Sequence, residues 1–429
     1  MTDPTAAREL SSRDVLRIRE YRLVWFAQLV SDIGDGLTNL ALLLLVNALT
    51  GSTAALALMA IVLAVPPMTI GLVAGAYVDR LDRRRVMLAS DLLRAGVVLG
   101  FVLVGSADRL WLLYVLAFVQ ATVGTFFNPA RGALLPRIVP ANGLLAANSV
   151  SQATRVVSGV IGAGLGGLLI GVLGTYWPAF VLDAATFLVS FLFVVRVSPE
   201  LGRPLATAAA AAEGILASIG DGLATIARSR TLGTTLVALA LSMLGLGAVN
   251  VLFVPLLVDD LRVATAWFGP VDLAQSSSMI LAAGLIGMLA ARVRSTTIVS
   301  AGLLGIGACL ALMSQVSSIW QVLVILFAVG WFITPLQAAV VTVLQLGVPD
   351  EQRGRIMAAL QAAMSGAGVL SMAFAGIAGD VVGVRTVFLA AGAILAVGGS
   401  LALLGYRSAG PRASSVTPPG AIAADSPTP

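Results

Sequence analysis

Twelve apolar segments recur along the chain, and each is long enough to cross a lipid bilayer as a helix. A spanning helix needs about 20 mainly apolar residues, because the hydrocarbon core is about 30 Å thick. The backbone finds no water in that core, so each segment must satisfy its own hydrogen bonds as a helix. Only 11% of the 429 residues are charged. We therefore predict an all-α membrane protein with twelve transmembrane helices, near residues 23–48, 53–78, 86–106, 110–130, 149–173, 176–197, 232–257, 269–290, 297–315, 319–346, 356–380 and 386–406.

The arginine residues predict how these helices are oriented. Short loops rich in Arg are retained in the cytoplasm during membrane insertion. With an even number of helices both termini lie on one side, and 21 arginines then share that side with them. Only three arginines fall on the other side, namely Arg109, Arg262 and Arg385. We predict a multi-pass protein of the plasma membrane with both termini in the cytoplasm.

A polar interruption divides the predicted helices into two groups of six. It contains prolines and an alanine run, followed by apolar residues at helical spacing between Glu213 and Arg230. That pattern is typical of an amphipathic helix that lies along a membrane surface. We predict a cytoplasmic N-terminus at 1–22, a six-helix bundle at 23–197, a cytoplasmic linker with an amphipathic helix at 198–231, a second six-helix bundle at 232–406 and a disordered cytoplasmic tail at 407–429.

Two short motifs occur in both halves and in the same order. A Gly-x-Phe-x-x-Pro pattern ends at Pro129 and again at Pro335, 206 residues later. A Val-Pro pair follows each copy, at Pro140 and at Pro349, 209 residues apart. Two ordered matches at nearly equal offsets indicate a duplicated six-helix unit with pseudo-symmetric halves, an arrangement typical of secondary transporters.

Several residue types are missing, and their absence excludes classes of function. All 26 basic residues are Arg, there is no Lys or His, and Cys309 is the only cysteine. Without Lys the chain cannot form a Walker phosphate loop, so we expect no nucleotide partner. One thiol without His supplies neither a zinc site nor a disulfide within one chain. The arginines lie at predicted helix ends, which favours lipid headgroups over nucleic acid as their partner.

An enzymatic alternative begins with Asp79 and Asp82. Their Asp-x-x-Asp spacing beside a membrane resembles a fragment of the Mg-binding motifs of membrane prenyltransferases. No second Asp-rich loop completes a two-metal site, and three arginines follow directly and compete for the carboxylates. We therefore expect no catalytic residue, no metal site and no cofactor.

The first predicted helix carries a polar stripe. Gln28, Asp32, Asp35 and Asn39 are spaced by four, three and four residues, which places them on one face. Carboxylates at this depth are costly, so they face an aqueous cavity or a partner. We predict that Asp32 or Asp35 couples substrate movement to a proton. In the alternative, one of the two is permanently paired with an Arg or caps a neighbouring helix.

Other polar residues inside predicted helices are candidates for a gate or a cavity. Asp91 and Arg94 are three residues apart in the third helix, close enough to pair with each other. Arg155 and Asp183 are lone intramembrane charges whose partners the sequence does not identify. We expect a cavity lined by Gln28, Asn39, Gln120, Asn128, Arg155, Gln337 and Gln361, although hydrogen bonds between helices are the commoner role of such amides.

The fifth predicted helix is rich in glycine. Small residues let the backbones of neighbouring membrane helices approach closely. They also lower the stiffness of the helix, which suits a protein whose parts must rock. The residues concerned are Gly159, Gly162, Gly164, Gly166 and Gly167.

The loop from Gly75 to Arg85 resembles a signature of the major facilitator superfamily. The signature, between helices two and three, reads Gly, any residue, a hydrophobic residue, any residue, Asp, Arg, any residue, Gly and two basic residues. Asp82 replaces its second Gly, a departure common in a drug-export branch similar to macrolide and enterobactin exporters. Two further segments, Ser31 to Asp35 and Val348 to Arg355, resemble the same branch. The resemblance covers all twelve helices.

The resemblance implies specific roles. Asp79 would bind the inner end of helix eleven, and Arg83 would complete a charge network that closes the cytoplasmic side. A carboxylate at a helix N-terminus gains about 0.3–1 kcal/mol from the helix dipole. The expected gate comprises Asp79, Arg80, Asp82, Arg83, Arg84, Asp91 and Arg94. The fifth helix resembles the antiporter signature Gly-Pro-x-x-Gly-Gly, with Ala163 in place of its Pro.

The function expected from these features is secondary active export. Lipophilic small molecules of drug, macrolide or siderophore type would leave the cell by alternating access, driven by protons. The expected partners are a small-molecule substrate, protons and the lipid bilayer. The alternatives are an importer, a uniporter or a lipid flippase of the same fold, and a membrane receptor that does not transport.

Overall fold

The computed structural model describes residues 9–78, 80–203, 230–347 and 350–408. These ranges contain helices and no strand, and twelve of the helices are 18 or more residues long. In the first half they are α2 (Arg19–Thr50), α3 (Thr53–Val78), α4 (Arg83–Gly100), α5 (Leu110–Ile138), α6 (Leu144–Leu173) and α7 (Trp177–Val195). In the second half they are α10 (Arg230–Pro255), α11 (Phe268–Arg292), α12 (Ser295–Met313), α13 (Ile319–Gly347), α14 (Asp350–Val382) and α15 (Val384–Ser408).

Each long helix overlaps one predicted span, which confirms the all-α membrane architecture. Eleven of the described helices are apolar over a window long enough to cross a membrane, and α11 is the twelfth long helix. Short elements lie at the ends of the molecule, including α1 (Ser12–Arg17), α8 (Pro199–Gly202) and the 3-10 turn η5 (Thr265–Trp267). The predicted amphipathic helix of the linker and most of the predicted disordered tail lie outside the described residues.

Local sequence signals explain where the helices turn. Gly51 and Gly174 follow α2 and α6 with φ of 60° and 64°. This left-handed conformation closes a helix C-terminus and strongly favours glycine. At the opposite end of the molecule, the Asp82 side chain caps α4 by accepting a hydrogen bond from the Arg85 backbone N–H at 3.1 Å.

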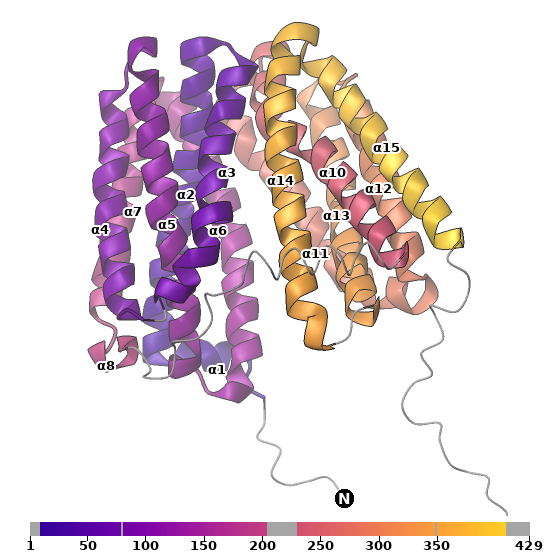
Figure 1. Ribbon diagram of the computed structural model, residues 1–429. Helices are drawn as coiled ribbons and strands as arrows, with labels where there is room; N and C mark the ends of the chain where they lie inside the picture. The colour runs from indigo at the N-terminus through magenta and orange to yellow at the C-terminus, as the bar shows by residue number, and fades with distance from the viewer. Residues whose placement is uncertain (1–8, 79, 204–229, 348–349, 409–429) are drawn as a thin grey trace, which may run out of the picture.

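The two halves are built from the same helix pairs. In the first half α2 packs against α6 and α7, α3 against α5, and α4 against α5 and α7. In the second half the equivalent pairs recur, since α10 packs against α14 and α15, α11 against α13, and α12 against α13 and α15. The halves meet through α3 with α14 and through α6 with α11, which are again equivalent pairs (Figure 1). This packing confirms the duplicated unit that the repeated motifs predicted.

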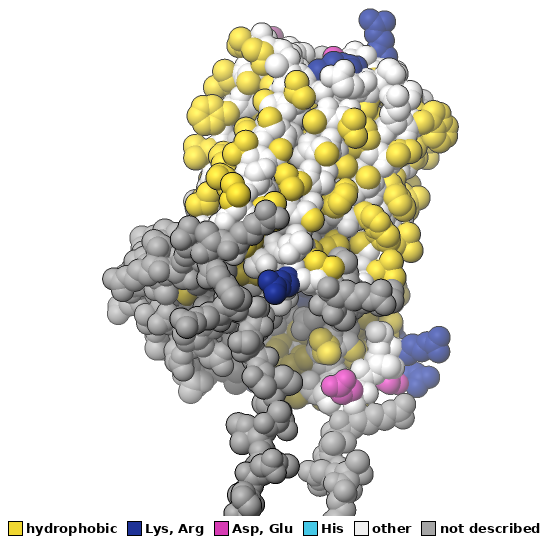
Figure 2. All heavy atoms as spheres, turned by 90° about the vertical axis from the view of Figure 1, so that its right-hand side faces the viewer, with side chains coloured by type: hydrophobic (Ala, Val, Ile, Leu, Met, Phe, Trp, Pro, Cys, Tyr) yellow, Lys and Arg dark blue, Asp and Glu magenta, His cyan; other side chains and the backbone are white. Residues whose placement is uncertain are grey.

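The outer surface suits a lipid environment. Figure 2 shows apolar side chains over the middle of the face formed by the second half, with charged side chains at both ends. Exposed apolar residues on the long helices include Trp111 at 65%, Val172 at 73% and Val381 at 77% of their accessible area. An apolar surface this extensive needs a covering phase, and the bilayer supplies it.

Hydrogen bonds between the halves gather at one end of the molecule. Helix α1 and the last turn of α15 lie at the other end, which we call the terminal end, and the end opposite is the far end (Figure 1). Among the described residues, every hydrogen bond that joins the halves lies at the far end. Asn47 donates to the Asp259 carboxylate, and Ser52, Thr53 and Ala54 donate to the Asp380 carboxylate. Thr53 also donates to the Gly376 carbonyl, and Thr265 donates to the Gly167 carbonyl.

Candidate functional site

A polar cavity of about 430 Å³ lies inside the first six helices. We call it the N-terminal cavity. Its walls come from α2, α3, α4 and α5, and its polar lining comprises Ser31, Asp32, Asp35, Asn39, Arg94, Gln120, Thr125 and Asn128. The structure therefore brings three of the four stripe residues of α2 together with two of the predicted amides of α5, whereas Gln28, which was also predicted to line a cavity, is buried and lines neither this cavity nor the central cavity described below.

An ion pair joins two helices in the wall of this cavity. Arg94 of α4 donates to the Asp35 carboxylate of α2. The Arg94 guanidinium also lies over the Phe187 ring of α7, 4.1 Å from its centroid. The Arg94 side chain is 8% exposed and that of Asp35 is 33% exposed, so the carboxylate faces the cavity more than its partner does.

The predicted pairing of Asp91 with Arg94 is wrong. Asp91 is fully buried and accepts a hydrogen bond from the Ser190 hydroxyl of α7 at 2.7 Å. Arg94 stands one turn further along α4 and points to α2 instead. The spacing brings the two residues near each other on α4, but tertiary packing supplies each of them with a partner from another helix.

Asp183 forms hydrogen bonds with two threonine hydroxyl groups. Its carboxylate accepts hydrogen bonds from Thr38 of α2 at 2.5 Å and from Thr186 of its own helix at 3.1 Å. This approach requires Gly34 in α2, because a Cβ atom there would collide with the side chains of Asp183 and Thr186. Gly34 belongs to the Ser-x-x-Gly-Asp segment that also carries Asp35, so this segment leaves room for the buried Asp183 side chain.

Gln28 and Asp32 belong to a second polar chain. The Gln28 amide nitrogen donates to Asp32 at 3.1 Å and to the Ser151 carbonyl at 3.1 Å. The Gln28 amide oxygen accepts a hydrogen bond from Arg131 of α5. Asp32 therefore reaches an arginine only through Gln28, whereas Asp35 has an arginine in direct contact.

The remaining predicted cavity residues divide into two groups. Gln120 and Asn128 line the N-terminal cavity, and the Asn128 amide oxygen accepts a hydrogen bond from Arg155 at 3.5 Å. Arg155, Gln337 and Gln361 are exposed and are not among the residues that line the N-terminal cavity or the central cavity described next.

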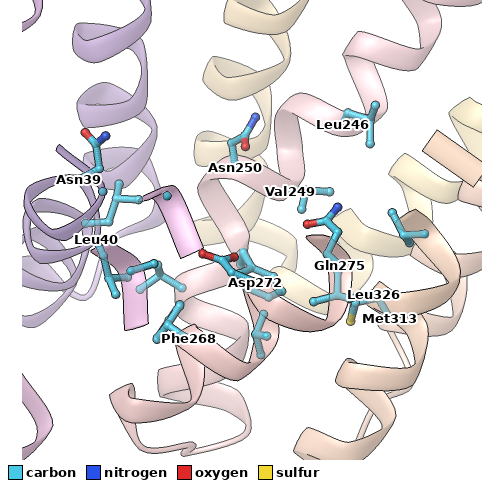
Figure 3. A pocket seen from close by; sticks show the side chains of 18 of the residues that line it. Asn39, Leu40, Leu246, Val249, Asn250, Phe268, Asp272, Gln275, Met313 and Leu326 are labelled. Atoms are coloured by element: carbon cyan, nitrogen blue, oxygen red, sulfur yellow. The ribbon is translucent and has the colours of Figure 1, made fainter. Parts of the chain in front are cut away.

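A second cavity of about 400 Å³ lies between the halves. We call it the central cavity. Helices α2 and α6 form its first-half wall, and α10, α11, α12 and α13 form the other. Its polar side chains are Asn39, Asn250, Asp272 and Gln275, and the rest of its lining is apolar or glycine (Figure 3). Asn39 lines both cavities, so α2 forms part of the wall of each.

Asp272 and Gln275 are two polar residues of the central cavity that were not singled out from the sequence. Asp272 and Gln275 lie one turn apart in α11, within the predicted span 269–290. The signal that singled out Asp32 was present here too, since Asp272 is a carboxylate inside a long apolar segment. Among the described residues, no group of three or more potential metal ligands comes together.

The glycines of α6 allow close contact on two faces. A Cβ atom at Gly162 would meet the backbone of α2 at Ile33 and Gly36, and one at Gly167 would meet the Thr265 carbonyl of η5 in the other half. Gly164 faces Gly269 of α11, and Gly166 faces Leu37 of α2. Gly159 has open space and lines the central cavity. The flexibility of this helix remains a prediction.

The predicted gate loop lies at the terminal end. Asp79 falls outside the described residues, and Arg80 is exposed. Arg83 is buried and donates to the Arg203 carbonyl at 2.8 Å, and Arg84 donates to the Val195 carbonyl at 2.6 Å. These bonds tie the start of α4 to the last residue of α7 and to the segment that follows it. The proposed roles of the loop residues as a gate remain predictions.

Comparison with known proteins agrees with this architecture. Residues 11–417 match the family described as transmembrane secretion effector. The chain is 30% identical to the multidrug efflux pump Tap of Mycolicibacterium fortuitum over 86% of its length and 91% of that protein. It is 23% identical to macrolide efflux protein A of Streptococcus pyogenes, covering 88% of this chain and 93% of the relative. Among solved structures, a mutant of the nucleoside transporter NupG superposes with a TM-score of 0.76 at 10% identity, over 90% of this chain and 99% of that one.

Proposed function

The chain belongs to the transmembrane secretion effector family of the major facilitator superfamily, a family of transporters and not of enzymes, and from this premise we propose that it is a proton-driven exporter of lipophilic small molecules. The observation that carries the proposal is the largely apolar central cavity enclosed by both halves. The export direction is supported by relatives whose names are those of multidrug and macrolide efflux proteins.

The contacts between the halves support a cycle of alternating access. In the described residues these hydrogen bonds lie at the far end, so this conformation is closed there. Release of substrate at the far end requires Asp380 to leave the N-terminus of α3 and Asp259 to leave Asn47. Each of these hydrogen bonds contributes only a few kcal/mol at most, so a cycle can break and remake them. The arginine distribution supports a cytoplasmic terminal end at the plasma membrane.

Proton coupling is assigned to the N-terminal cavity. A proton that binds Asp35 removes the charge that holds Arg94, and the freed guanidinium can then rotate toward the cavity or toward Asp91. Asp32 lines the same cavity and offers a second site for the proton. Because α2 also lines the central cavity through Asn39, movement of α2 links proton binding to the substrate site.

Transport in proteoliposomes tests this function. An imposed proton gradient should drive accumulation of a lipophilic compound, and the double variant Asp32→Asn, Asp35→Asn should lose that accumulation. Exchange of the same compound without a gradient should persist in the variant. Asp108→Asn, in an exposed turn at the far end, is the matched control and should transport as the parent does. Gradient-independent counterflow alone would favour a uniporter, and no movement of any candidate compound would contradict transport.

A further inference from the structure

Asp272 differs from every other described carboxylate inside the membrane-spanning bundles. The four in the first half each have a partner: Asp32 accepts a hydrogen bond from Gln28, Asp35 pairs with Arg94, Asp91 accepts from Ser190 and Asp183 accepts from Thr38. For Asp272, the structure gives no hydrogen bond or ion pair with any described residue. Figure 3 shows its carboxylate directed into the space between α2 and α10, in the wall of the central cavity.

An unpartnered carboxylate at this depth is unfavourable unless something else supplies a partner. Removing an ionised group from water costs free energy that only a counter-charge or hydrogen bonds recover. The nearby amides of Asn39, Asn250 and Gln275 line the same cavity and leave the carboxylate free. A positively charged occupant of the cavity would supply the counter-charge that the described residues do not provide.

The rest of the cavity specifies the occupant further. Asp272 is the only charged residue among those that line it, so the cavity carries one negative charge and no counter-charge of its own. Phe253 and Phe268 line the cavity with their rings edge to face, 6.3 Å apart. Aromatic faces attract cations as well as apolar groups. The volume of about 400 Å³ lies in the range that drug-sized ligands occupy.

We propose that the central cavity selects lipophilic cations and that Asp272 binds their positive charge. This inference rests on the proposed export function and names its substrate class. It also assigns different ligands to different residues, because Asp35 and Asp32 would bind the proton while Asp272 binds the substrate. Asp272 repels an anion of the same size, and a neutral compound gains nothing from its charge.

Equilibrium binding to the purified full-length protein tests the proposal without any proton gradient. Three probes of similar shape are compared: tetraphenylphosphonium, which is a cation, triphenylphosphine oxide, which is neutral, and tetraphenylborate, which is an anion. The parent protein should bind the cation most tightly. Asp272→Asn should weaken cation binding by about 10- to 100-fold, the value of a charge-assisted interaction, and should change binding of the neutral probe less than about twofold.

Two further variants keep the result interpretable. Asp272→Glu should retain preference for the cation, because the charge remains, and Asp108→Asn should bind all three probes as the parent does. Equal loss of the cation and the neutral probe in Asp272→Asn would mean a structural role and would overturn the proposal. Unchanged cation binding in that variant would mean that Asp272 does not bind the charge of the cation and would also overturn the proposal. Because the assay needs no transport, either result leaves the export function to its own test.

Discussion

The two halves share their helix packing and differ in their chemistry. Five helix pairs recur in equivalent positions. The first half places a network of charges inside its bundle, with Asp35 bound to Arg94 and with Asp91 and Asp183 held by hydroxyl groups. The second half places one described carboxylate, Asp272, at the central cavity, among apolar side chains. The comparison teaches that duplication preserved geometry while the polar residues diverged, which is the basis for our proposal that Asp35 of one half binds the proton and Asp272 of the other binds the substrate.

The two equivalent contacts between the halves also differ in chemistry. Where α3 meets α14, the Asp380 carboxylate accepts hydrogen bonds from the Thr53 backbone N–H at 2.7 Å and from the Ser52 hydroxyl at 2.7 Å. At the equivalent contact of α6 with the start of α11, the Thr265 hydroxyl donates to the Gly167 carbonyl at 2.8 Å. One contact is charged and the other is neutral, so they should not respond equally to substitution.

The largest effect is expected from removing Arg94. Arg94→Met leaves Asp35 without its partner in a largely buried setting. We expect the free energy of unfolding to fall by roughly 2–4 kcal/mol, less than for a fully buried pair because the Asp35 side chain is 33% exposed. Thermal unfolding in detergent measures this, and the double variant Arg94→Met, Asp35→Asn should recover part of the loss. If Arg94→Met unfolds like the parent, the charge network of the first half does not stabilise it.

Glycine substitutions test whether the geometry is shared. Gly162 lies against α2, with its added Cβ 3.0 Å from Gly36 Cα, and in the equivalent pair Gly247 of α10 lies against Ser371 of α14, with its added Cβ 2.6 Å away. Gly162→Ala and Gly247→Ala should each cost roughly 1–3 kcal/mol through overpacking. Gly159→Ala, where nothing lies within 4 Å, is the control. A loss confined to one half would contradict equivalent packing.

Loss of the charged contact at the far end should shift the balance between conformations. Asp380→Ala removes the hydrogen bonds to Ser52, Thr53 and Ala54, and we expect a shift of about 1–2 kcal/mol toward a state that is open at the far end. Spin labels at Ser106→Cys and Ser317→Cys, in a Cys309→Ser background, report the distance between the halves. The distance distribution should broaden toward longer values. Thr265→Val, at the neutral contact, should shift it less, and an equal shift would remove the distinction.

The smallest effect on stability is expected at Asp272. Asp272→Asn keeps the shape of the side chain and removes a charge that has no described partner. We expect the unfolding free energy to stay the same or to rise by up to about 1 kcal/mol, as is common when a functional charge is neutralised. Asp35→Asn should instead destabilise, because it leaves Arg94 without its carboxylate. Matched thermal unfolding curves of the two variants compare the halves directly.

The sequence predicted the helices well because length and apolarity alone decide whether a segment spans a membrane. It predicted the duplication because two motifs kept their order and offset. The sequence did not predict which charged residues pair inside the bundle. Arg94 bonds to Asp35, 59 positions away, although Asp91 lies only three positions away. Residues that line the central cavity, such as Leu246 and Phe253, also escaped prediction. Helices that are apolar all round carry no periodic signal that distinguishes a cavity face from a lipid face.

The most direct test of the division between the halves compares two variants in one assay. Proteoliposomes with an acidic lumen, with the membrane potential clamped by potassium and valinomycin, are given tetraphenylphosphonium or triphenylphosphine oxide. Asp35→Asn should lose acid-driven accumulation of both compounds and retain their gradient-free exchange. Asp272→Asn should lose accumulation and exchange of the cation while it retains acid-driven accumulation of the neutral compound. The reverse pattern, with Asp35→Asn losing only the cation and Asp272→Asn losing only the response to the gradient, would contradict the account.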